Sequence, residues 1–193
     1  TLVWMANYTA IEIHPWLSRT DQPDEPDIAI IDLDPSTGAT WDDVKETALI
    51  VRDVLHGIDL EGFPKTTGSR GIHILVPIAS TYTFDESRGF VEQIGKAAQQ
   101  RVPKLVTLTF AKKERRGIYI DYLQNIQGKT VAGPYCVRAK PGATVSTPLK
   151  WPALTGDLDP RDYHLDNAAD RFEKIGDIWN EAMRKKNSLR ALV

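Results

Sequence analysis

Two carboxylates one residue apart close an apolar run in this chain. The run Ile28–Ile31 leads into Asp32, Leu33, Asp34 and Pro35. Side chains alternate between the two faces of a β-strand, so Asp32 and Asp34 point the same way and Leu33 points to the opposite side. Mg²⁺ and Mn²⁺ prefer oxygen ligands, and adjacent carboxylates can bridge two ions about 3.5–4 Å apart, an arrangement used for phosphoryl and nucleotidyl transfer. Taken alone, Asp-x-Asp also fits a strand that ends in a solvated acidic turn.

A second polar group follows in the segment Thr67–His73, which reads Thr-Gly-Ser-Arg-Gly-Ile-His. Its small residues would let backbone N–H groups approach an anion, and Ser69, Arg70 and His73 would supply side-chain donors. His73 alternates with two isoleucines, so it should face away from the apolar side of its strand. By itself, this segment also fits a hairpin turn that carries a solvated arginine.

The third candidate is Asp121, which lies in the apolar segment Ile118–Tyr122 and shares a strand face with Tyr119. A single acid in such a strand usually marks a sheet edge or a salt bridge. Together with Asp32 and Asp34, however, it gives three carboxylates. Nucleotidyl transfer needs two cations at the attacking and leaving oxygens and positive charge against the triphosphate. The sequence carries no Ser-His-Asp arrangement, zinc-type Cys/His spacing or Walker loop that would favour other chemistry.

The composition favours one soluble domain. The 193 residues are 41% hydrophobic, which suffices for one domain with a core. The net charge is −2, so no overall basic field points to nucleic acid and any such contact must come from a local patch. The single cysteine, Cys136, excludes an internal disulfide and fits a reducing compartment. No apolar stretch approaches the roughly 18 residues of a membrane span, and no signal peptide opens the chain, so we expect a cytoplasmic protein with no membrane partner.

Three helices are predicted from apolar periodicity and caps. A capping box at Thr40 opens a helix that runs to about His56. A second capping box at Thr83 opens a helix that ends before Pro103. A third helix is predicted over residues 168–186, with an apolar face that should pack in the core. The residues of that face are Phe172, Ile175, Trp179 and Met183.

Strands are predicted between the helices, and the resulting order indicates an α+β fold, a mixed α/β sheet with helices against one face. The predicted strands are Ile28–Leu33, Gly62–Thr66, Ile72–Pro77, Leu105–Phe110, Ile118–Leu123 and Thr130–Arg138. The second and third of these flank two glycines and should form a hairpin. Residues 144–165, rich in Pro, Thr and Asp, are expected to form a surface loop.

The three polar motifs, in this order and spacing, resemble the signature motifs of the archaeo-eukaryotic primase-polymerase superfamily. The resemblance narrows to the polymerase domain of bacterial ligase D and its stand-alone relatives, and it covers essentially the whole chain. Further segments that carry it are Leu2–Asn7, Glu12–Arg19, Phe63–Gly68, Asp121–Asn125 and Pro134–Arg138. It implies a palm sheet like that of an RNA-recognition motif (RRM-like). It also implies that the protein extends and fills gapped or overhanging DNA ends in non-homologous end joining. Its partners would be a DNA ligase and Ku, and it would be associated with the nucleoid.

The same resemblance implies roles for individual residues. Asp32 and Asp34 would ligate two ions, Mn²⁺ or Mg²⁺, and Asp121 would complete the site of the ion that activates the primer 3′-OH. The residues that would meet the phosphates of the incoming ribo- or deoxyribonucleoside triphosphate are Thr67, Ser69, Arg70, His73, Lys129 and Arg138. The family usually has Ser at Thr67 and often Lys at Arg70, and both exchanges keep a hydroxyl and a cation. A preference for ribonucleotides and for manganese is also implied.

The chain opens at Thr1 without an initiator Met and runs directly into apolar sequence. The ligase D family has an upstream segment that recognises the DNA 5′-phosphate, and we find no counterpart of it. We therefore expect residues 1–193 to be a primase-polymerase catalytic domain that lacks its N-terminal segment. The remaining basic residues would offer a diffuse patch that follows the DNA backbone: Lys112, Lys113, Arg115, Arg116, Lys129, Arg138 and Lys140.

Two alternatives compete with this interpretation. The segment Ile31–Ser36 resembles the nucleophile motif of haloacid-dehalogenase-type phosphatases, in which Asp32 would attack phosphate and Asp34 would act as acid and base. Gly156 and Asp157 would then be the distal acidic motif, although they follow no apolar strand. The other alternative is a catalytically inactive module that only binds DNA or a repair partner. A nucleotide-release assay separates the three, because each predicts a different product.

Overall fold

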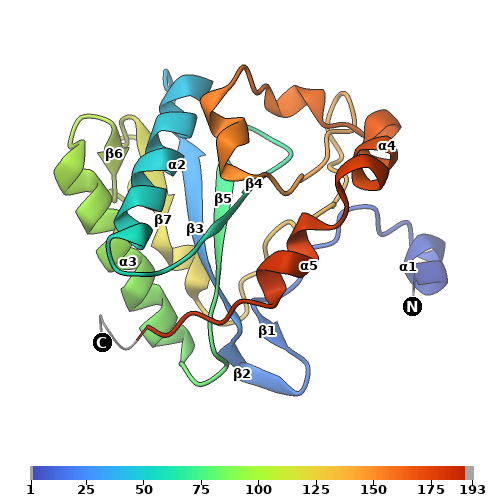
Figure 1. Ribbon diagram of the computed structural model, residues 1–193, viewed down its shortest axis with the longest axis horizontal. Helices are drawn as coiled ribbons and strands as arrows, with labels where there is room; N and C mark the ends of the chain where they lie inside the picture. The colour runs from blue at the N-terminus through green and yellow to red at the C-terminus, as the bar shows by residue number, and fades with distance from the viewer. Residues whose placement is uncertain (1, 190–193) are drawn as a thin grey trace.

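A five-stranded mixed sheet forms the centre of the molecule (Figure 1). The computed structural model describes residues 2–189 of the chain. The strand order is β4-β5-β3-β7-β6, and every neighbouring pair is antiparallel except β6 and β7. Its strands are β3 (Ile28–Pro35), β4 (Phe63–Thr66), β5 (Ile72–Pro77), β6 (Val106–Thr107) and β7 (Ile118–Asp121). A separate two-stranded sheet pairs β1 (Ser18–Arg19) with β2 (Gln22–Pro26).

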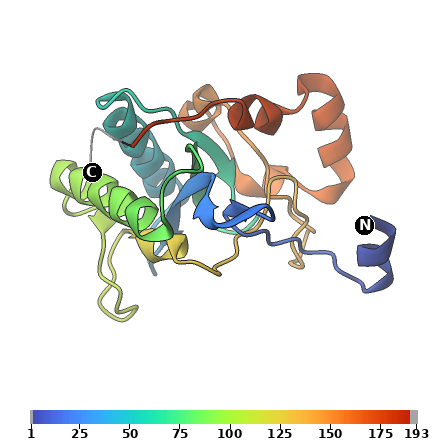
Figure 2. The ribbon, with the colours of Figure 1, turned by 90° about the horizontal axis from the view of Figure 1, so that it is seen from below.

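Two long helices, α2 and α3, pack side by side on one face of this sheet and contact each other (Figure 1). The α-helices are α1 (Leu2–Asn7), α2 (Trp41–His56), α3 (Phe84–Arg101), α4 (Leu165–Ile175) and α5 (Ile178–Met183). Residues 2–189 also form three 3₁₀ helices: η1 (Tyr122–Asn125), η2 (Trp151–Thr155) and η3 (Pro160–Asp162). Figure 2 shows α1 at the end of the molecule opposite to α3. Within residues 2–189, none of the helices combines the length and apolar character that crossing a bilayer requires.

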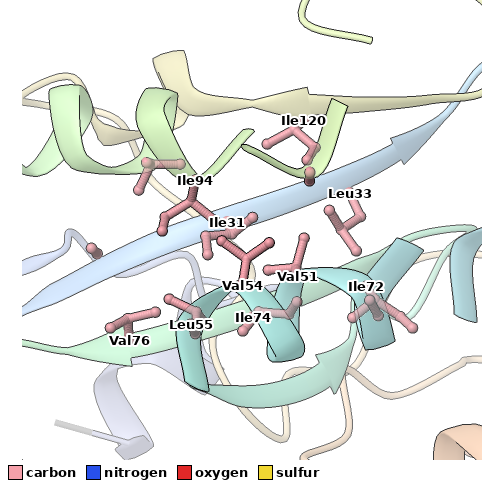
Figure 3. Close-up of a cluster of buried hydrophobic side chains, with 14 of the residues drawn as sticks. Ile31, Leu33, Val51, Val54, Leu55, Ile72, Ile74, Val76, Ile94 and Ile120 are labelled. Carbon is pink, nitrogen blue, oxygen red and sulfur yellow. The ribbon is translucent and has the colours of Figure 1, made fainter. Parts of the chain in front are cut away.

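The alternation of side chains along β3 separates the core from the site. Ile31 and Leu33 are fully buried against α2 and α3, together with Ile74 of β5 and Ile120 of β7 (Figure 3). The residues between them point to the other face of the sheet, which no long helix covers. The predicted α+β fold with helices on one face is therefore confirmed, and the open face is the one that carries the polar residues of the strands.

The first two predicted helices form as their caps indicate. Thr40 accepts a hydrogen bond from the N–H of Asp43, whose carboxylate accepts one from the N–H of Thr40, and α2 ends at His56. Thr83 and Glu86 make the same reciprocal pair at the start of α3. Such a box satisfies two of the four free N–H groups at a helix start, so each helix begins where its sequence predicts.

The prediction of one core helix over residues 168–186 is wrong. Gly176 adopts a φ of 73°, which ends α4, and the side chain of Asp177 then accepts hydrogen bonds from two N–H groups and opens α5. Because the helix is interrupted, the four predicted core residues do not lie on one continuous helix face. Phe172 and Ile175 are 44% and 43% exposed instead of buried. The buried residues of this region are Ile178 and Ala182 of α5.

Two predicted strands also differ from the structure. Residues 130–138 form no strand, because Pro134 lacks an N–H and Tyr135 adopts a φ of 63°, and only Val137 makes an isolated bridge, to Val145. The strand predicted over residues 105–110 shrinks to β6, Val106–Thr107. The expected surface loop 144–165 contains η2 and η3, and η2 contacts α2.

Candidate active site

Three carboxylates meet on the open face of the sheet. Asp32 and Asp34 come from β3, and Asp121 ends β7, where it lies directly opposite Asp32. One carboxylate oxygen from each residue lies within 4.8 Å of the others, and no further group of this kind occurs among residues 2–189. This convergence of Asp121 with two residues almost ninety positions earlier is what the sequence predicts. Directly opposite residues of an antiparallel pair share one face, which explains how two separate motifs meet.

A buried asparagine fixes the end of β7. Asn125 is fully buried at the end of η1, the 3₁₀ helix that follows Asp121. Its side-chain amide donates to the carbonyl of Ile30 and its oxygen accepts from the N–H of Ile30, both at 2.8 Å. The side chain of Asn125 thus makes the two hydrogen bonds to the backbone of Ile30 that a further residue of β7 would otherwise make. This holds Asp121 in register with Asp32.

The three carboxylates oppose one another electrostatically. Burial raises the pKa of Asp32 to about 6, and burial together with the charges of Asp32 and Asp121 raises the pKa of Asp34 to about 6. Burial and the charge of Asp32 also raise the pKa of Asp121. Asp32 Oδ1 is buried and accepts no hydrogen bond of good geometry, although His73 Nε2 lies 3.3 Å from it. An orphaned carboxylate oxygen within a cluster of oxygen ligands fits a divalent cation, which would remove the repulsion and occupy the free oxygen.

Four neighbouring strands place one residue each in a row across the open face. Lys65 of β4 lies opposite His73 of β5, His73 lies opposite Asp32, and Asp32 lies opposite Asp121. His73 Nε2 is 3.3 Å from Asp32 Oδ1, and Lys65 Nζ is 2.8 Å from His73 Nδ1. His73 therefore faces away from the core helices, as predicted.

Lys65 was not predicted as a site residue. It is 1% exposed, and its Nζ also donates to Ser146 Oγ at 2.5 Å. Burial lowers its pKa to about 7, while burial and the adjacent Lys65 hold the pKa of His73 well below its usual value. A lysine in the middle of the strand Phe63–Thr66 was the available signal, since lysine is almost never fully buried without a partner.

The turn after β4 forms as expected, but part of its backbone is already engaged. Thr67 Oγ1 accepts hydrogen bonds from the N–H groups of Ser69 and Gly71, at 3.1 and 3.3 Å. Gly71 is required here, because a Cβ at this position would lie 2.4 Å from the carbonyl oxygen of Leu33. These two N–H groups therefore shape the turn, and the side chains are left as the donors for an anion.

A cavity of about 290 Å³ joins the carboxylates to this turn. Among the predicted residues it is lined by Asp32, Asp34, Thr67, Ser69, Arg70, His73 and Arg138. Asp121 and Lys129 are not part of the lining, and Lys129 is exposed. Sequence reasoning missed His14 as a lining residue, and it placed Lys140 only in the diffuse DNA patch. His14 stands in a motif that carried the family resemblance, but nothing in its local spacing indicated that this segment crosses to the turn.

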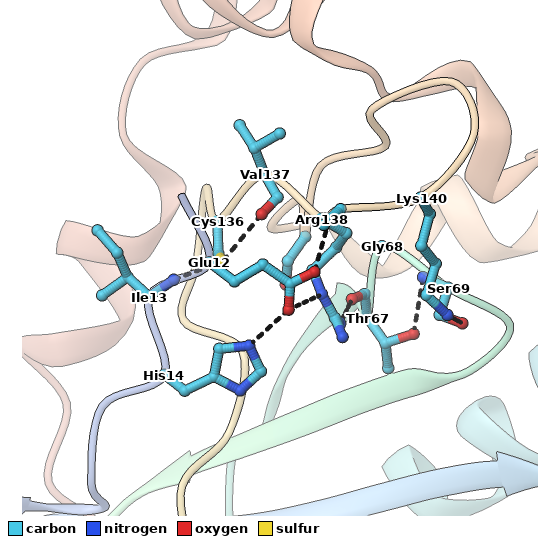
Figure 4. Close-up of polar contacts among 12 residues, drawn as sticks. Glu12, Ile13, His14, Thr67, Gly68, Ser69, Cys136, Val137, Arg138 and Lys140 are labelled. Atoms are coloured by element: carbon cyan, nitrogen blue, oxygen red, sulfur yellow. Dashed lines mark hydrogen bonds and ion pairs between the residues drawn. The ribbon is translucent and has the colours of Figure 1, made fainter. Parts of the chain in front are cut away.

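Glu12 ties the N-terminal segment to the cavity wall (Figure 4). Its carboxylate accepts hydrogen bonds from the N–H of Ala139 at 2.6 Å and from His14 at 3.0 Å, and it lies 3.3 Å from Arg138 Nε. Arg138 in turn donates to the carbonyl of Thr67 at 2.6 Å. Glu12 thus holds two of the lining residues, although it does not line the cavity itself.

We predict that Glu12→Ala weakens binding of the nucleoside triphosphate that the motifs predict for this cavity about fivefold, because Arg138 and His14 lose the acceptor that orders them. Glu12→Gln should weaken it to a similar extent, since an amide oxygen that still accepts from Ala139 turns its NH₂ group, a donor, toward Arg138 Nε. Nucleotide titration of both variants by calorimetry tests this. Tighter binding in both variants would show instead that the Glu12 charge opposes the phosphates.

A second hollow, of about 520 Å³, begins at Asp34 and Pro35, where β3 ends. It extends from Asp34 to Arg70 and is lined by four basic residues of one loop: Lys112, Lys113, Arg115 and Arg116. The guanidinium carbon of Arg115 lies 3.5 Å from the ring centre of Tyr119, and Tyr119 donates to Asp121 Oδ1 at 3.2 Å. The carboxylates therefore lie between two sets of cationic side chains.

Comparisons of the sequence with known proteins point to one family. The family described as LigD, primase-polymerase domain, matches residues 1–179. The chain is 33% identical over 180 residues to the multifunctional non-homologous end joining protein LigD of Mycolicibacterium smegmatis, a match that covers 92% of the chain and 24% of that protein. It is 31% identical over 179 residues to the bifunctional non-homologous end joining protein LigD of Bacillus subtilis, with 91% and 29% covered. The chain thus spans less than a third of the length of these relatives.

The structural comparison leads to the same family. The polymerase domain of Mycobacterium tuberculosis ligase D in complex with DNA superposes with a TM-score of 0.85 at 28% identity, over 96% of this chain and 68% of that one. Nothing in these comparisons supports the phosphatase alternative, and Asp157 lies outside the carboxylate cluster. By its fold and by its match over residues 1–179, the chain belongs to the LigD primase-polymerase family.

Proposed function

We propose that this chain is a DNA-directed polymerase that adds nucleotides to the 3′ ends of DNA during non-homologous end joining. Its family implies an enzyme of the nucleotidyltransferase type. The observation that carries the proposal is the cluster of Asp32, Asp34 and Asp121 beside a cavity with cationic walls. This combination offers metal ligands and phosphate donors at adjacent positions, which polymerisation requires.

In this proposal each group of residues has one task. Asp32 and Asp34 would hold two divalent cations, manganese or magnesium, and Asp121 would complete the site of the one that activates the primer 3′-OH. When bound, the ions lower the pKa of the primer hydroxyl and offset charge on the leaving oxygen. His73, Arg70 and the other donors of the 290 Å³ cavity hold the triphosphate. Lys129 is exposed outside this cavity, so we do not retain a triphosphate role for it.

The repair pathway and the DNA partner are supported by the names of the relatives, whereas Ku and the preference for ribonucleotides and manganese come from the resemblance of the motifs. Both LigD proteins act in non-homologous end joining, and the superposed polymerase domain was solved with DNA. We propose that this chain forms one catalytic domain, works with a DNA ligase and Ku on the DNA of the nucleoid, and prefers ribonucleotides and manganese. The loop that carries Lys112 and Arg115 would follow the backbone of gapped or overhanging DNA.

A product assay tests the proposal. Incubation with manganese, a nucleoside triphosphate and a primer with a recessed 3′ end should give an extended primer and one pyrophosphate per added nucleotide. A phosphatase would instead release inorganic phosphate from a monoester without DNA, and a binding module would release neither. A primer that ends in a dideoxynucleotide is the control, because it binds but offers no 3′-OH.

We predict that His73→Ala raises the dissociation constant for nucleotide about tenfold and changes that for primer-template less than about twofold. The buried ring of His73 lines the 290 Å³ cavity and not the 520 Å³ hollow, which is the one that the basic loop lines. His56→Ala is the matched control, since His56 is exposed in the last turn of α2. Equal losses for nucleotide and DNA would remove His73 from the nucleotide site.

A further inference from the structure

Phe110 is an exposed aromatic residue in the loop that joins β6 to β7. It is 69% exposed. Among residues 2–189, every other large apolar residue that is exposed lies either in the N-terminal segment 3–16 or in α4. Phe110 stands instead beside the basic part of the loop, whose charged residues are Lys112, Lys113, Glu114, Arg115 and Arg116. Single exposed apolar side chains are common on protein surfaces, so the position of this one among cations is what points to a ligand.

The backbone of Phe110 is held in place although the loop projects from the body of the molecule, where Figure 2 shows it in yellow-green. Arg115 donates hydrogen bonds to the carbonyls of Thr109 at 3.1 Å and of Phe110 at 2.9 Å. The guanidinium of Arg115 lies in turn over the ring of Tyr119 in β7. Leu108, two residues before Phe110, packs against the hydrophobic core. A fixed backbone therefore presents the exposed ring, which reduces the entropy that binding must offset.

Cationic side chains and an aromatic ring together suit single-stranded nucleic acid. Lysine and arginine neutralise the backbone phosphates, whereas an aromatic ring stacks on a base of any sequence. Within a duplex each base is covered by its neighbours, so a side chain stacks on it only after the base steps have been forced apart. An unpaired base offers its face without this cost. The ring of Phe110 is therefore matched to an unpaired base whose flanking phosphates contact the loop.

We propose that Phe110 stacks on an unpaired base of the template strand at a recessed 3′ end. The inference rests on the proposed function, in which the primer 3′-OH lies at the carboxylates. The 520 Å³ hollow begins at Asp34 and reaches the basic loop, so a strand that follows it passes from the site of nucleotide addition to the loop. At a recessed 3′ end, the strand that continues unpaired beyond the primer is the template. The stack distinguishes such an end from a blunt duplex.

Binding of DNA to the full chain in the absence of nucleotide tests the stack. Fluorescence anisotropy compares a labelled duplex that has a recessed 3′ end with a blunt duplex of the same paired sequence. Phe110→Ala should weaken binding of the recessed end about tenfold and binding of the blunt duplex less than about twofold. Phe110→Leu keeps an apolar side chain without a ring, so it should lose as much, whereas Phe110→Trp should retain the affinity of the wild type. Phe172→Ala is the matched control, because it removes an exposed phenyl ring from α4 and should bind both duplexes as the wild type does.

The salt dependence of binding separates the ring from the cations of the loop. Phe110 carries no charge, so its removal should leave the slope of log K against log salt concentration unchanged. Lys112→Ala should reduce that slope by about 0.7–0.9 for the phosphate that it no longer neutralises. A reduced slope in Phe110→Ala overturns the stack, because the substitution would then act through the phosphate contacts.

Abasic template positions identify the base itself. An abasic nucleotide keeps its phosphate but offers no ring to stack on. At one position of the overhang it should weaken wild-type binding about tenfold and Phe110→Ala binding less than about twofold, because both changes remove the same interaction. Additive losses at every position, or equal losses of Phe110→Ala on recessed and blunt DNA, overturn the inference. Primer extension on the same DNA tests the proposed function separately: a chain that extends the primer without this coupling contradicts only the stack, and a chain that adds no nucleotide contradicts the proposed function.

Discussion

In the proposed function, Asp32→Asn should reduce nucleotide addition by about a thousandfold or more while the fold remains intact, because a neutral amide cannot replace the charged carboxylate that would hold the divalent cations. In metal-free buffer at neutral pH the variant should also be about 1 kcal/mol more stable than the wild type. Burial raises the pKa of Asp32 to about 6, so its negative charge destabilises the folded state. Single-turnover primer extension and urea denaturation measure the two effects.

The exposed Asp157 provides the matched control. Asp157→Asn changes the same charge outside the carboxylate cluster, so both activity and stability should stay near wild type. It also tests the phosphatase alternative, in which Asp157 would be essential. Collapse of the Asp32→Asn fold would assign Asp32 a purely structural role, and activity above a few per cent would contradict its role as a metal ligand.

Manganese should raise the free energy of unfolding at pH 7.5 by about 2.7 kcal/mol at about one hundred times its dissociation constant, and this gain should disappear near pH 5. Burial raises the pKa of Asp32 and of Asp34 to about 6 in the metal-free fold, above the value of about 3.9 in an unfolded chain. Below pH 6, protons therefore compete with the metal for the same oxygens.

The metal-free protein should respond to pH in the opposite direction. Between about pH 4 and pH 6 the folded state binds more protons at these two carboxylates than the unfolded state does, so their contribution to stability falls as the pH rises. Urea denaturation at pH 5 and pH 7.5, with and without manganese, measures both trends. Asp32→Asn should reduce the stabilisation by manganese and the fall of metal-free stability with rising pH. If manganese stabilised this variant as much as the wild type, the metal would bind elsewhere.

The strand residues of the site could be predicted because strand alternation is local. Asp32, Asp34 and His73 each sit between apolar neighbours, so their common face follows from the period of two. The partners of Lys65 could not be predicted in this way. Ser146 meets Lys65 from 81 positions away, through a loop whose path depends on long-range packing.

The remaining differences have the same physical origin. Glu12 joins the loop at Ala139 across 127 positions, and neither segment has a period that indicates the other. In the third predicted helix, the apolar spacing continued through Gly176, but the positive φ of that glycine ended the helix. Periodicity reports which residues can share a face, and it carries no information about where a chain reverses or which loop it meets.

The alignment of Lys65, His73, Asp32 and Asp121 in one row depends on the register of the sheet. His73, Asp32 and Asp121 alternate with apolar residues that belong to the core packed against α2 and α3. A slip of one residue in β3, β5 or β7 would turn a charged or polar group into the core and expose an isoleucine or leucine. The free energy that buries the apolar residues therefore also disfavours every one-residue slip of these three strands, and each such slip would misalign the site.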